Sequence, residues 1–157
     1  MLLQRKPSRW TCLPVSFAMA LNIAVEDIFA ELGHDGSTIF WPDLPEPMCR
    51  RGFHIQELIE VALRRGFTVT PFELSPVLES GGKQYIFDER WTKFATVIAN
   101  SVGVLEGNGI RTRHAVAYEF GQIFDPDSGV YDYSRAACEG RFFYANCAWR
   151  IDRRQDV

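Results

Sequence analysis

The sequence predicts an α+β domain, in which an N-terminal helical part packs on an antiparallel β-sheet. Apolar residues recur at helical spacing as far as residue 66, and beyond that point short apolar segments separated by turn residues are typical of strands. The length of 157 residues and the hydrophobic content of 46% suit one compact core. We therefore expect residues 1–157 to form a single domain with two lobes.

The first expected helix covers residues 13–23. Leu13, Phe17 and Leu21 fall on one face of this helix. Pro14 falls in the first turn, where a helix does not use the N–H group that proline lacks. The helix therefore begins directly after a cysteine, Cys12.

Two more helices are expected in the first half of the chain. Residues 24–36 predict a short amphipathic helix that ends at Gly33, because glycine readily adopts the left-handed conformation that follows a helix. Residues 53–67 carry an apolar stripe and predict a third helix, which ends at Gly66. The intervening residues 37–52 contain three prolines and predict a loop or arm.

The second half is expected to consist mainly of strands. Residues 113–120 and 122–126 flank Gly121 and predict a β-hairpin. Residues 93–106 predict one or two buried strands. The remaining expected strands are 67–74, 130–134 and 141–151, with a short helical turn between the last two.

Cys12, at the start of the first expected helix, is a candidate nucleophile. A thiolate attacks a carbonyl carbon and a thiol does not, and a helix N-terminus supplies the partial positive charge that favours a thiolate. Such a cysteine also needs an imidazole, a group that orients the imidazole, and donors for the oxyanion. The alternative is that Cys12 is a small buried core residue, which is common for a lone cysteine.

The expected hairpin supplies the imidazole and its orienting group. It brings His114 and Asp125 opposite each other to within about one residue, so that their side chains can meet. Asp127 is the alternative carboxylate, but it follows Pro126 in a turn that we expect to bend the chain away. Gln4 lies eight positions before Cys12 and is a candidate oxyanion donor beside the Cys12 backbone N–H. A solvated Gln4, or a His114 bonded to a carbonyl group, would be the structural alternatives.

Two motifs carry a family resemblance. The segment "TCLPVSFAMALN" at 11–22 resembles the cysteine motif of the C39-like branch of the papain-like cysteine peptidases, and "RHAVAYEFGQIFDP" at 113–126 is similar to the histidine and aspartate hairpin of that branch. The resemblance covers about residues 4–128. It implies a papain-like fold and a peptidase that needs no cofactor.

Carried onto this sequence, the resemblance implies that Cys12 is the nucleophile and His114 the base. It implies that Asp125 orients the imidazole and that Gln4 donates to the oxyanion. The sequence departs from the family pattern at Leu13, where glycine is usual, so a side chain beside the nucleophile bears on the substrate class.

Several other residues have both a functional and a structural interpretation. Trp10, Leu13 and Trp41 are candidates for substrate binding at the mouth of a cleft, with ordinary packing as the alternative. His34, Cys49 and His54 are of zinc-ligand type, but their spacing is irregular and no CxxC pair occurs, so we expect no metal. Cys138 and Cys147 are expected to be free thiols in the core.

Charge and hydropathy exclude some classes of partner. A net charge of −3 gives no reason to expect nucleic acid or an anionic membrane surface as a partner. No apolar run approaches the roughly 18 residues of a membrane span, so a cytoplasmic location is expected. We expect a peptide or protein substrate whose amide bond is hydrolysed. The same residues also suit an acyltransferase, transglutaminase or deamidase, or a non-catalytic protein that only binds peptides.

Overall fold

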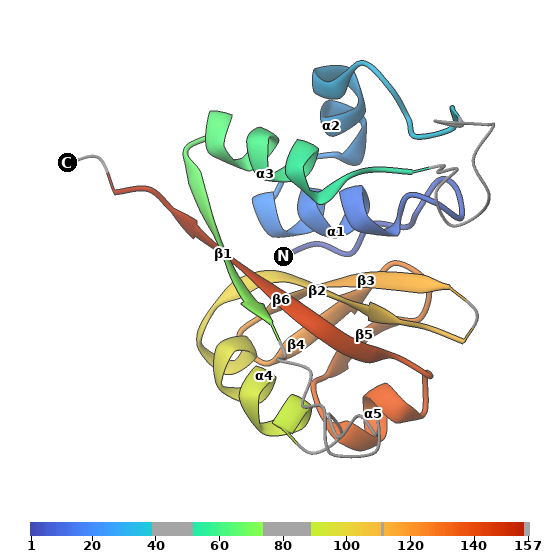
Figure 1. Ribbon diagram of the computed structural model, residues 1–157, viewed down its shortest axis with the longest axis vertical. Coiled ribbons are helices and arrows are strands. Elements are labelled where there is room, and N and C mark those ends of the chain that lie inside the picture. The colour runs from blue at the N-terminus through green and yellow to red at the C-terminus, as the bar shows by residue number, and fades with distance from the viewer. Residues whose placement is uncertain (39–51, 74–88, 111, 156–157) are drawn as a thin grey trace, which may run out of the picture.

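The computed structural model describes residues 1–38, 52–73, 89–110 and 112–155, and shows a six-stranded antiparallel sheet covered by helices on both faces (Figure 1). The strand order is β1-β6-β2-β3-β4-β5. The strands are β1 Phe67–Glu73, β2 Val102–Asn108, β3 Arg113–Glu119, β4 Gln122–Asp125, β5 Gly129–Asp132 and β6 Tyr144–Arg153. The helices are α1 Cys12–Leu21, α2 Val25–Leu32, α3 Ile55–Arg64, α4 Glu89–Asn100 and α5 Arg135–Glu139. The expected α+β architecture is therefore confirmed.

Alternating residues of the central strands supply two hydrophobic clusters, one on each face of the sheet. On β2, Val104 packs toward α1, α2 and α3, whereas the next residue, Leu105, packs toward α4 and α5. On β3, Ala115 and Ala117 belong to the first cluster and Val116 to the second. This alternation follows from the two-residue period of a strand, and it places the helices α1–α3 together on one face.

The expectation for residues 93–106 was wrong in its first part, which belongs to the twelve-residue helix α4. Arg90, Phe94 and Ile98 are the buried residues of α4, and they recur at every fourth position, whereas most residues between them are exposed. Such spacing places the three on one helical face, against the sheet. Of the β-branched residues in the helical part of this segment, Thr96 is exposed, Val97 is half-buried and Ile98 is buried.

Helix α1 is the central helix of the fold, because every residue from Pro14 to Leu21 is buried. Asn22 ends it in the left-handed conformation, with φ of 57°, and its backbone N–H bonds the Ala18 and Met19 carbonyl oxygens. Among the described residues no single helix is long and apolar enough to cross a membrane; α1 and α2 meet that test only as a pair bent by 111°.

The hairpin of β3 and β4 forms as predicted and turns at Phe120 and Gly121, both with positive φ. Its pairing sets Ala117 opposite Phe124. Continuing this register places Asp125 opposite the residue two positions beyond His114, so that the pair is diagonal on one face rather than directly opposite. The offset differs from the predicted one by about one residue, but the two side chains still share a face.

Candidate active site

Cys12 is the first residue of α1, and side-chain hydrogen bonds fix the backbone around it. Thr11, which is 1% exposed, donates its hydroxyl to the Ser8 carbonyl oxygen over 2.8 Å. Ser16 donates its hydroxyl to the Cys12 carbonyl oxygen, also over 2.8 Å. The Cys12 side chain is half-buried and lies at the end of α1 where unpaired N–H groups give a positive potential.

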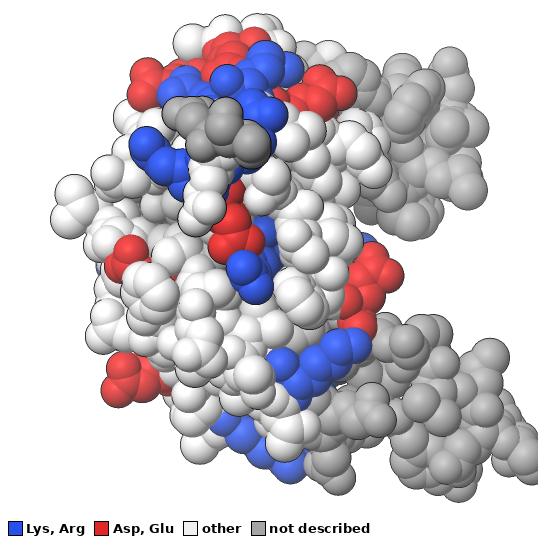
Figure 2. All heavy atoms as spheres, turned by 90° about the vertical axis from the view of Figure 1, so that its left-hand side faces the viewer, with Lys and Arg blue, Asp and Glu red and all other residues white. Residues whose placement is uncertain are grey.

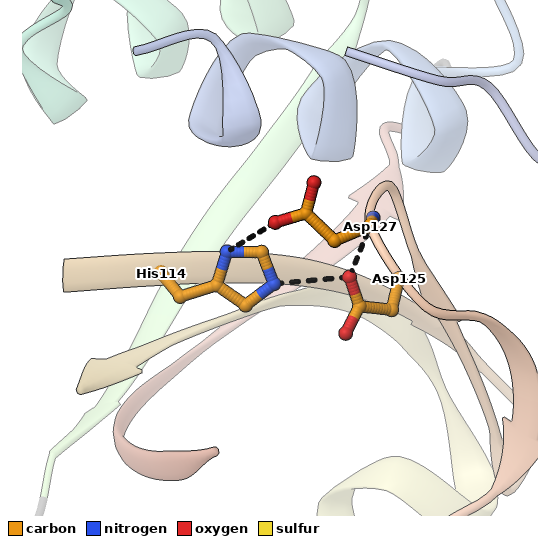
Figure 3. Close-up of side chains that lie close together, drawn as sticks. All are labelled: His114, Asp125 and Asp127. Atoms are coloured by element: carbon orange, nitrogen blue, oxygen red, sulfur yellow. Dashed lines mark hydrogen bonds and ion pairs between the residues drawn. The ribbon is translucent and has the colours of Figure 1, made fainter. Parts of the chain in front are cut away.

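The His114 imidazole is hydrogen-bonded to the Asp125 carboxylate (Figure 3). The distance between His114 Nε2 and Asp125 Oδ1 is 3.0 Å. Asp125 is 3% exposed and also accepts hydrogen bonds from the Asp127 N–H and the Ser128 hydroxyl, each over 2.8 Å. Phe143 packs edge-on against the His114 ring, with 5.6 Å between the ring centroids. These contacts fix the orientation of the imidazole, and its Nδ1 atom is not used in the bond to Asp125.

Electrostatic interactions favour the charged form of His114. Burial lowers the pKa of the imidazole, but hydrogen bonds to Asp125 and to Cys12, together with the charges of both groups, outweigh burial and raise that pKa to about 9. Burial raises the pKa of Asp125, but hydrogen bonds from His114, the Asp127 N–H and Ser128 outweigh it and hold that pKa below its usual range. The site therefore favours an imidazolium between a carboxylate and the Cys12 sulfur.

Gly107, on the strand β2 next to His114, allows a close approach of two strands. Gly107 pairs with His114 on one side and lies against β6 on the other, where the pairing shifts register. A Cβ atom at Gly107 would lie 2.0 Å from the Tyr144 carbonyl oxygen. Only glycine therefore fits here without moving the backbone that positions His114.

Asp127 lies closer to the imidazole than the sequence predicts. Its Oδ2 atom is 3.9 Å from His114 Nδ1, whereas we expected the turn after Pro126 to bend it away. The same oxygen lies 2.7 Å from the Lys6 ammonium, and Arg5 donates to the Asp127 carbonyl oxygen over 2.9 Å. The N-terminal segment thus holds the turn against the site. The pairing register of the β3–β4 hairpin could have indicated this proximity, because its continuation sets position 127 opposite His114.

An open cavity of about 530 Å³ connects these residues. Its wall includes Cys12, His114, Asp125 and Asp127, and residues between β2 and β3, Gly109, Ile110 and Thr112, form one side of it. A volume of this size suits a short peptide segment or a small ligand. The structure therefore brings Cys12, His114 and Asp125 to one cavity, as the sequence predicts.

Gln4 is not part of this cavity, and its predicted role as an oxyanion donor is contradicted. Its side-chain amide donates to the Ile23 carbonyl oxygen over 2.6 Å, and its side-chain oxygen accepts from the Val25 N–H over 3.0 Å. Both bonds lie at the C-terminal end of α1, about 15 Å along the helix from Cys12. Gln4 instead ties the N-terminal segment to the corner between α1 and α2.

The predicted substrate-binding residues are not in the described cavity wall. Trp10 is half-buried and donates its indole N–H to the Asp35 carbonyl oxygen over 3.2 Å. Leu13 is half-buried and packs against the core between the sheet and α1–α3. Trp41 lies outside the described residues. Residues that sequence reasoning missed, among them Lys6, Arg9 and Arg141, line the cavity instead.

The remaining histidines have structural contacts. His34 Nε2 lies 3.0 Å from Glu57 Oε1, and its ring stacks on Phe53. His54 is the N-cap of α3 and takes part in a capping box with Glu57. Cys49 lies outside the described residues.

Cys138 and Cys147 are free and buried, as predicted. Burial raises the pKa of the Cys138 thiol to about 11 and that of the Cys147 thiol to about 12. Neither is therefore a competing nucleophile near neutral pH.

Three residues of the site are also of metal-ligand type. His114, Asp125 and Asp127 offer ligand atoms that all lie within 4.8 Å of one another. The Asp125 oxygens already accept hydrogen bonds from three donors, and one of these is His114 Nε2 itself. This bonding pattern suits an oriented imidazole better than a set of free ligands.

A scan against protein-family models and a search of curated proteins each gave no match. Among solved structures, the chain is similar to the peptidase domain of Streptococcus ComA, described as a bi-functional ABC transporter involved in a quorum-sensing pathway. The similarity covers 98% of both chains, with a TM-score of 0.58 and 12% identity. The Streptococcus mutans ComA peptidase domain in complex with a small-molecule inhibitor also matches, with 97% and 99% coverage, a TM-score of 0.46 and 14% identity. The chain therefore has the α+β papain-like fold of the first of these peptidase domains.

Proposed function

We propose that this chain is a cysteine peptidase of the C39-like, papain-like type, with Cys12 as nucleophile, His114 as base and Asp125 as the residue that orients His114. One observation carries the proposal: Cys12 and a His114 imidazole that is hydrogen-bonded to the buried Asp125 line one cavity, on the fold of a peptidase domain. A core cysteine has no need of an imidazole whose other nitrogen is held by a buried carboxylate.

The reaction would proceed through an acyl-thioester. The Cys12 sulfur attacks the carbonyl carbon of an amide, and the resulting oxyanion is stabilised by the N–H groups at the start of α1. The imidazolium of His114 gives its proton to the leaving amine as the C–N bond breaks. Water then attacks the thioester while His114 accepts a proton from it, the C–S bond breaks, and the acid product leaves.

Asp125 acts through His114 in this scheme. Its hydrogen bond with Nε2 selects the tautomer that carries the proton on Nε2, so that Nδ1 can accept the proton of the thiol, and its negative charge stabilises the imidazolium. The bond cleaved would be a peptide or isopeptide bond in a peptide or protein substrate. Gln4 has no part in the chemistry, since both of its polar groups are bonded at the far end of α1.

Reaction with a panel of peptidyl vinyl sulfones, followed by mass spectrometry, tests the proposal. We expect one adduct per chain, located on Cys12, in the folded protein. Heat-unfolded protein and the His114→Ala variant should react far more slowly at the same pH, because the imidazole no longer assists. Cys138→Ala is the matched control and should react like the wild type. Equal reaction of folded and unfolded protein would contradict the proposal.

A further inference from the structure

The cavity wall carries an excess of positive charge. Four cationic side chains line it, and they come from separate parts of the chain: Lys6, Arg9, Arg113 and Arg141. The described wall holds only two carboxylates, Asp125 and Asp127. The sequence as a whole has a net charge of −3, so the cavity wall is positively charged in a protein that is negatively charged overall.

Both carboxylates are already engaged. Asp125 accepts hydrogen bonds from His114, the Asp127 N–H and Ser128. The Asp127 carboxylate lies 2.7 Å from the Lys6 ammonium. Neither is placed to neutralise the arginines of the wall.

Arg141 is held in place by two contacts. Its guanidinium carbon lies 3.9 Å from the centre of the Tyr131 ring, and one of its nitrogens donates to the Ala137 carbonyl oxygen over 3.0 Å. A guanidinium has five N–H donors in a fixed plane, so donors remain for a ligand in the cavity. Little side-chain entropy would be lost on binding, because the group is already oriented.

Arg9 is exposed and forms no hydrogen bond or ion pair with any residue in the described ranges. It lies three residues before Cys12, in the segment that leads into α1. Arg113 contributes less, because its nearest carboxylate oxygen, on Glu106, is 3.8 Å away and its side chain is 74% exposed. Arg9 and Arg141 are therefore the two cations best placed to bind an anionic group beside the nucleophile.

The charged side chains over α2 and α3, away from the cavity, are arranged differently from those of the cavity wall. In Figure 1 the cavity elements, the start of α1 and the β2–β3 loop, lie at the right, and Figure 2 shows the molecule from the left. On that face, acidic and basic side chains lie side by side over α2 and α3, where Glu31 pairs with Arg64 and Arg65. These two arginines over α2 and α3 thus have an acidic partner, whereas Arg9 and Arg141 of the cavity wall have no ion-pair partner among the described residues.

We propose that the cavity selects a peptide with a carboxylate close to the bond that Cys12 attacks, and that Arg9 and Arg141 bind this carboxylate. The inference rests on the proposed function and names the substrate class for the same site. A carboxylate and a guanidinium pair with two parallel hydrogen bonds, which gives direction as well as charge attraction. The group is either an Asp or Glu side chain or the terminal carboxylate of a peptide.

Alkylation of Cys12 by reagents of different charge tests the cavity without a substrate. Iodoacetate and iodoacetamide react by the same displacement, but only iodoacetate carries a carboxylate. The rate with iodoacetate is divided by the rate with iodoacetamide at Cys12, and this ratio is divided by the same ratio for N-acetylcysteine amide. We expect the resulting normalised ratio to be about 3 to 10 at low salt and to fall in 0.5 M salt. This ratio can be measured even when both reagents react slowly. Slow labelling of Cys12 by both reagents would therefore contradict the peptidase proposal but not the proposed preference for a carboxylate.

Variants assign the preference to the arginines. Arg9→Ala and Arg141→Ala should each lower the ratio by about threefold, and Arg9→Glu should lower it further. Arg154→Ala is the charge-matched control, because Arg154 donates to the Leu63 carbonyl oxygen beside α3 and is not in the cavity wall. It should leave the ratio unchanged. A ratio near one in the wild type, or an equal ratio in all variants, would overturn the proposal.

Short peptides distinguish the two sources of the carboxylate. Acetyl-Ala-Asp-Ala-amide is compared with its Asn analogue, and acetyl-Ala-Ala-Ala with its amide, as protectors of Cys12 against iodoacetamide. Stronger protection by the Asp peptide assigns a side-chain carboxylate, and stronger protection by the free acid assigns a terminal one. If neither acid protects better than its neutral analogue, the carboxylate site does not exist.

Discussion

Asp127 lies 3.9 Å from His114 Nδ1, although a proline separates it from the strand that carries Asp125. The imidazole therefore has a carboxylate near each nitrogen, with the bond to Asp125 at 3.0 Å and the contact to Asp127 longer and more exposed. Asp125 is buried and bonded by three donors, whereas Asp127 faces Lys6. The two carboxylates should consequently differ in their effect on the site.

Asp125→Ala should lower turnover by a factor on the order of tens to thousands, because the imidazole loses its orienting bond and the charge that stabilises the imidazolium. Asp127→Ala should lower turnover by less than about tenfold and change stability by about 1 kcal/mol or less, because its ion pair is exposed. Turnover, melting temperature and the NMR titration of His114 are measured for both variants. The pKa of His114 should fall in Asp125→Ala. A larger loss of activity in a well-folded Asp127→Ala protein would reverse the assignment.

The pH dependence of stability follows from His114. Its pKa is raised from 6.5 in the unfolded chain to about 9 in the folded protein. The stability that this proton binding contributes is therefore fully present below about pH 6.5 and is lost as the pH rises through about 9. Urea unfolding between pH 6 and 9.5 should show a loss of up to about 3 kcal/mol, and His114→Gln should flatten this dependence. A wild-type protein whose stability is constant over this range would contradict the ion pair.

Iodoacetamide at pH 7 should label Cys12 well before the other thiols. The pKa values of Cys138 and Cys147 are raised to about 11 and about 12 by burial, so these side chains are protonated and shielded. We expect Cys12 to react at least about 100-fold faster than either, and faster than Cys49. Peptide mapping after timed labelling measures the rates. Labelling of Cys12 at the rate of the buried pair would remove it as a nucleophile.

Gln4→Ala tests the corrected role of the N-terminal segment. The substitution removes two hydrogen bonds at the corner between α1 and α2, so we expect stability to fall by about 1 to 3 kcal/mol. The rate of reaction at Cys12 should stay within about twofold of the wild type under conditions where the variant is folded. A stable variant with strongly reduced turnover would instead restore the oxyanion assignment.

Much of the fold follows from local patterns in the sequence. Helix α1 follows from its apolar periodicity and from Pro14 in its first turn, and the β3–β4 hairpin follows from Gly121 between two strand-like segments. Helix α4 was missed because its apolar and β-branched residues run directly into β2, and only Phe94 and Ile98 mark the buried face. Short apolar runs do not separate a helix from a strand by periodicity alone.

The site was predictable where one local element sets the geometry. His114 and Asp125 share a hairpin, so their proximity follows from strand pairing. Gln4 has no such element, because a segment without helix or strand connects it to Cys12 and tertiary contacts decide where its amide lies. Arg141 reaches the cavity from the connection between α5 and β6, more than a hundred residues from Cys12, and no local pattern indicates that contact.

Digestion of a proteome-derived peptide library, with new N-termini identified by mass spectrometry, tests the central claim most directly. The wild type and Cys12→Ala are compared at equal concentration, and their melting temperatures are measured first, since one half-buried sulfur is removed and the fold should persist. We predict new N-termini with the wild type and none with Cys12→Ala. New termini in equal number with both proteins, or with neither while both are folded, would contradict a peptidase that acts through Cys12.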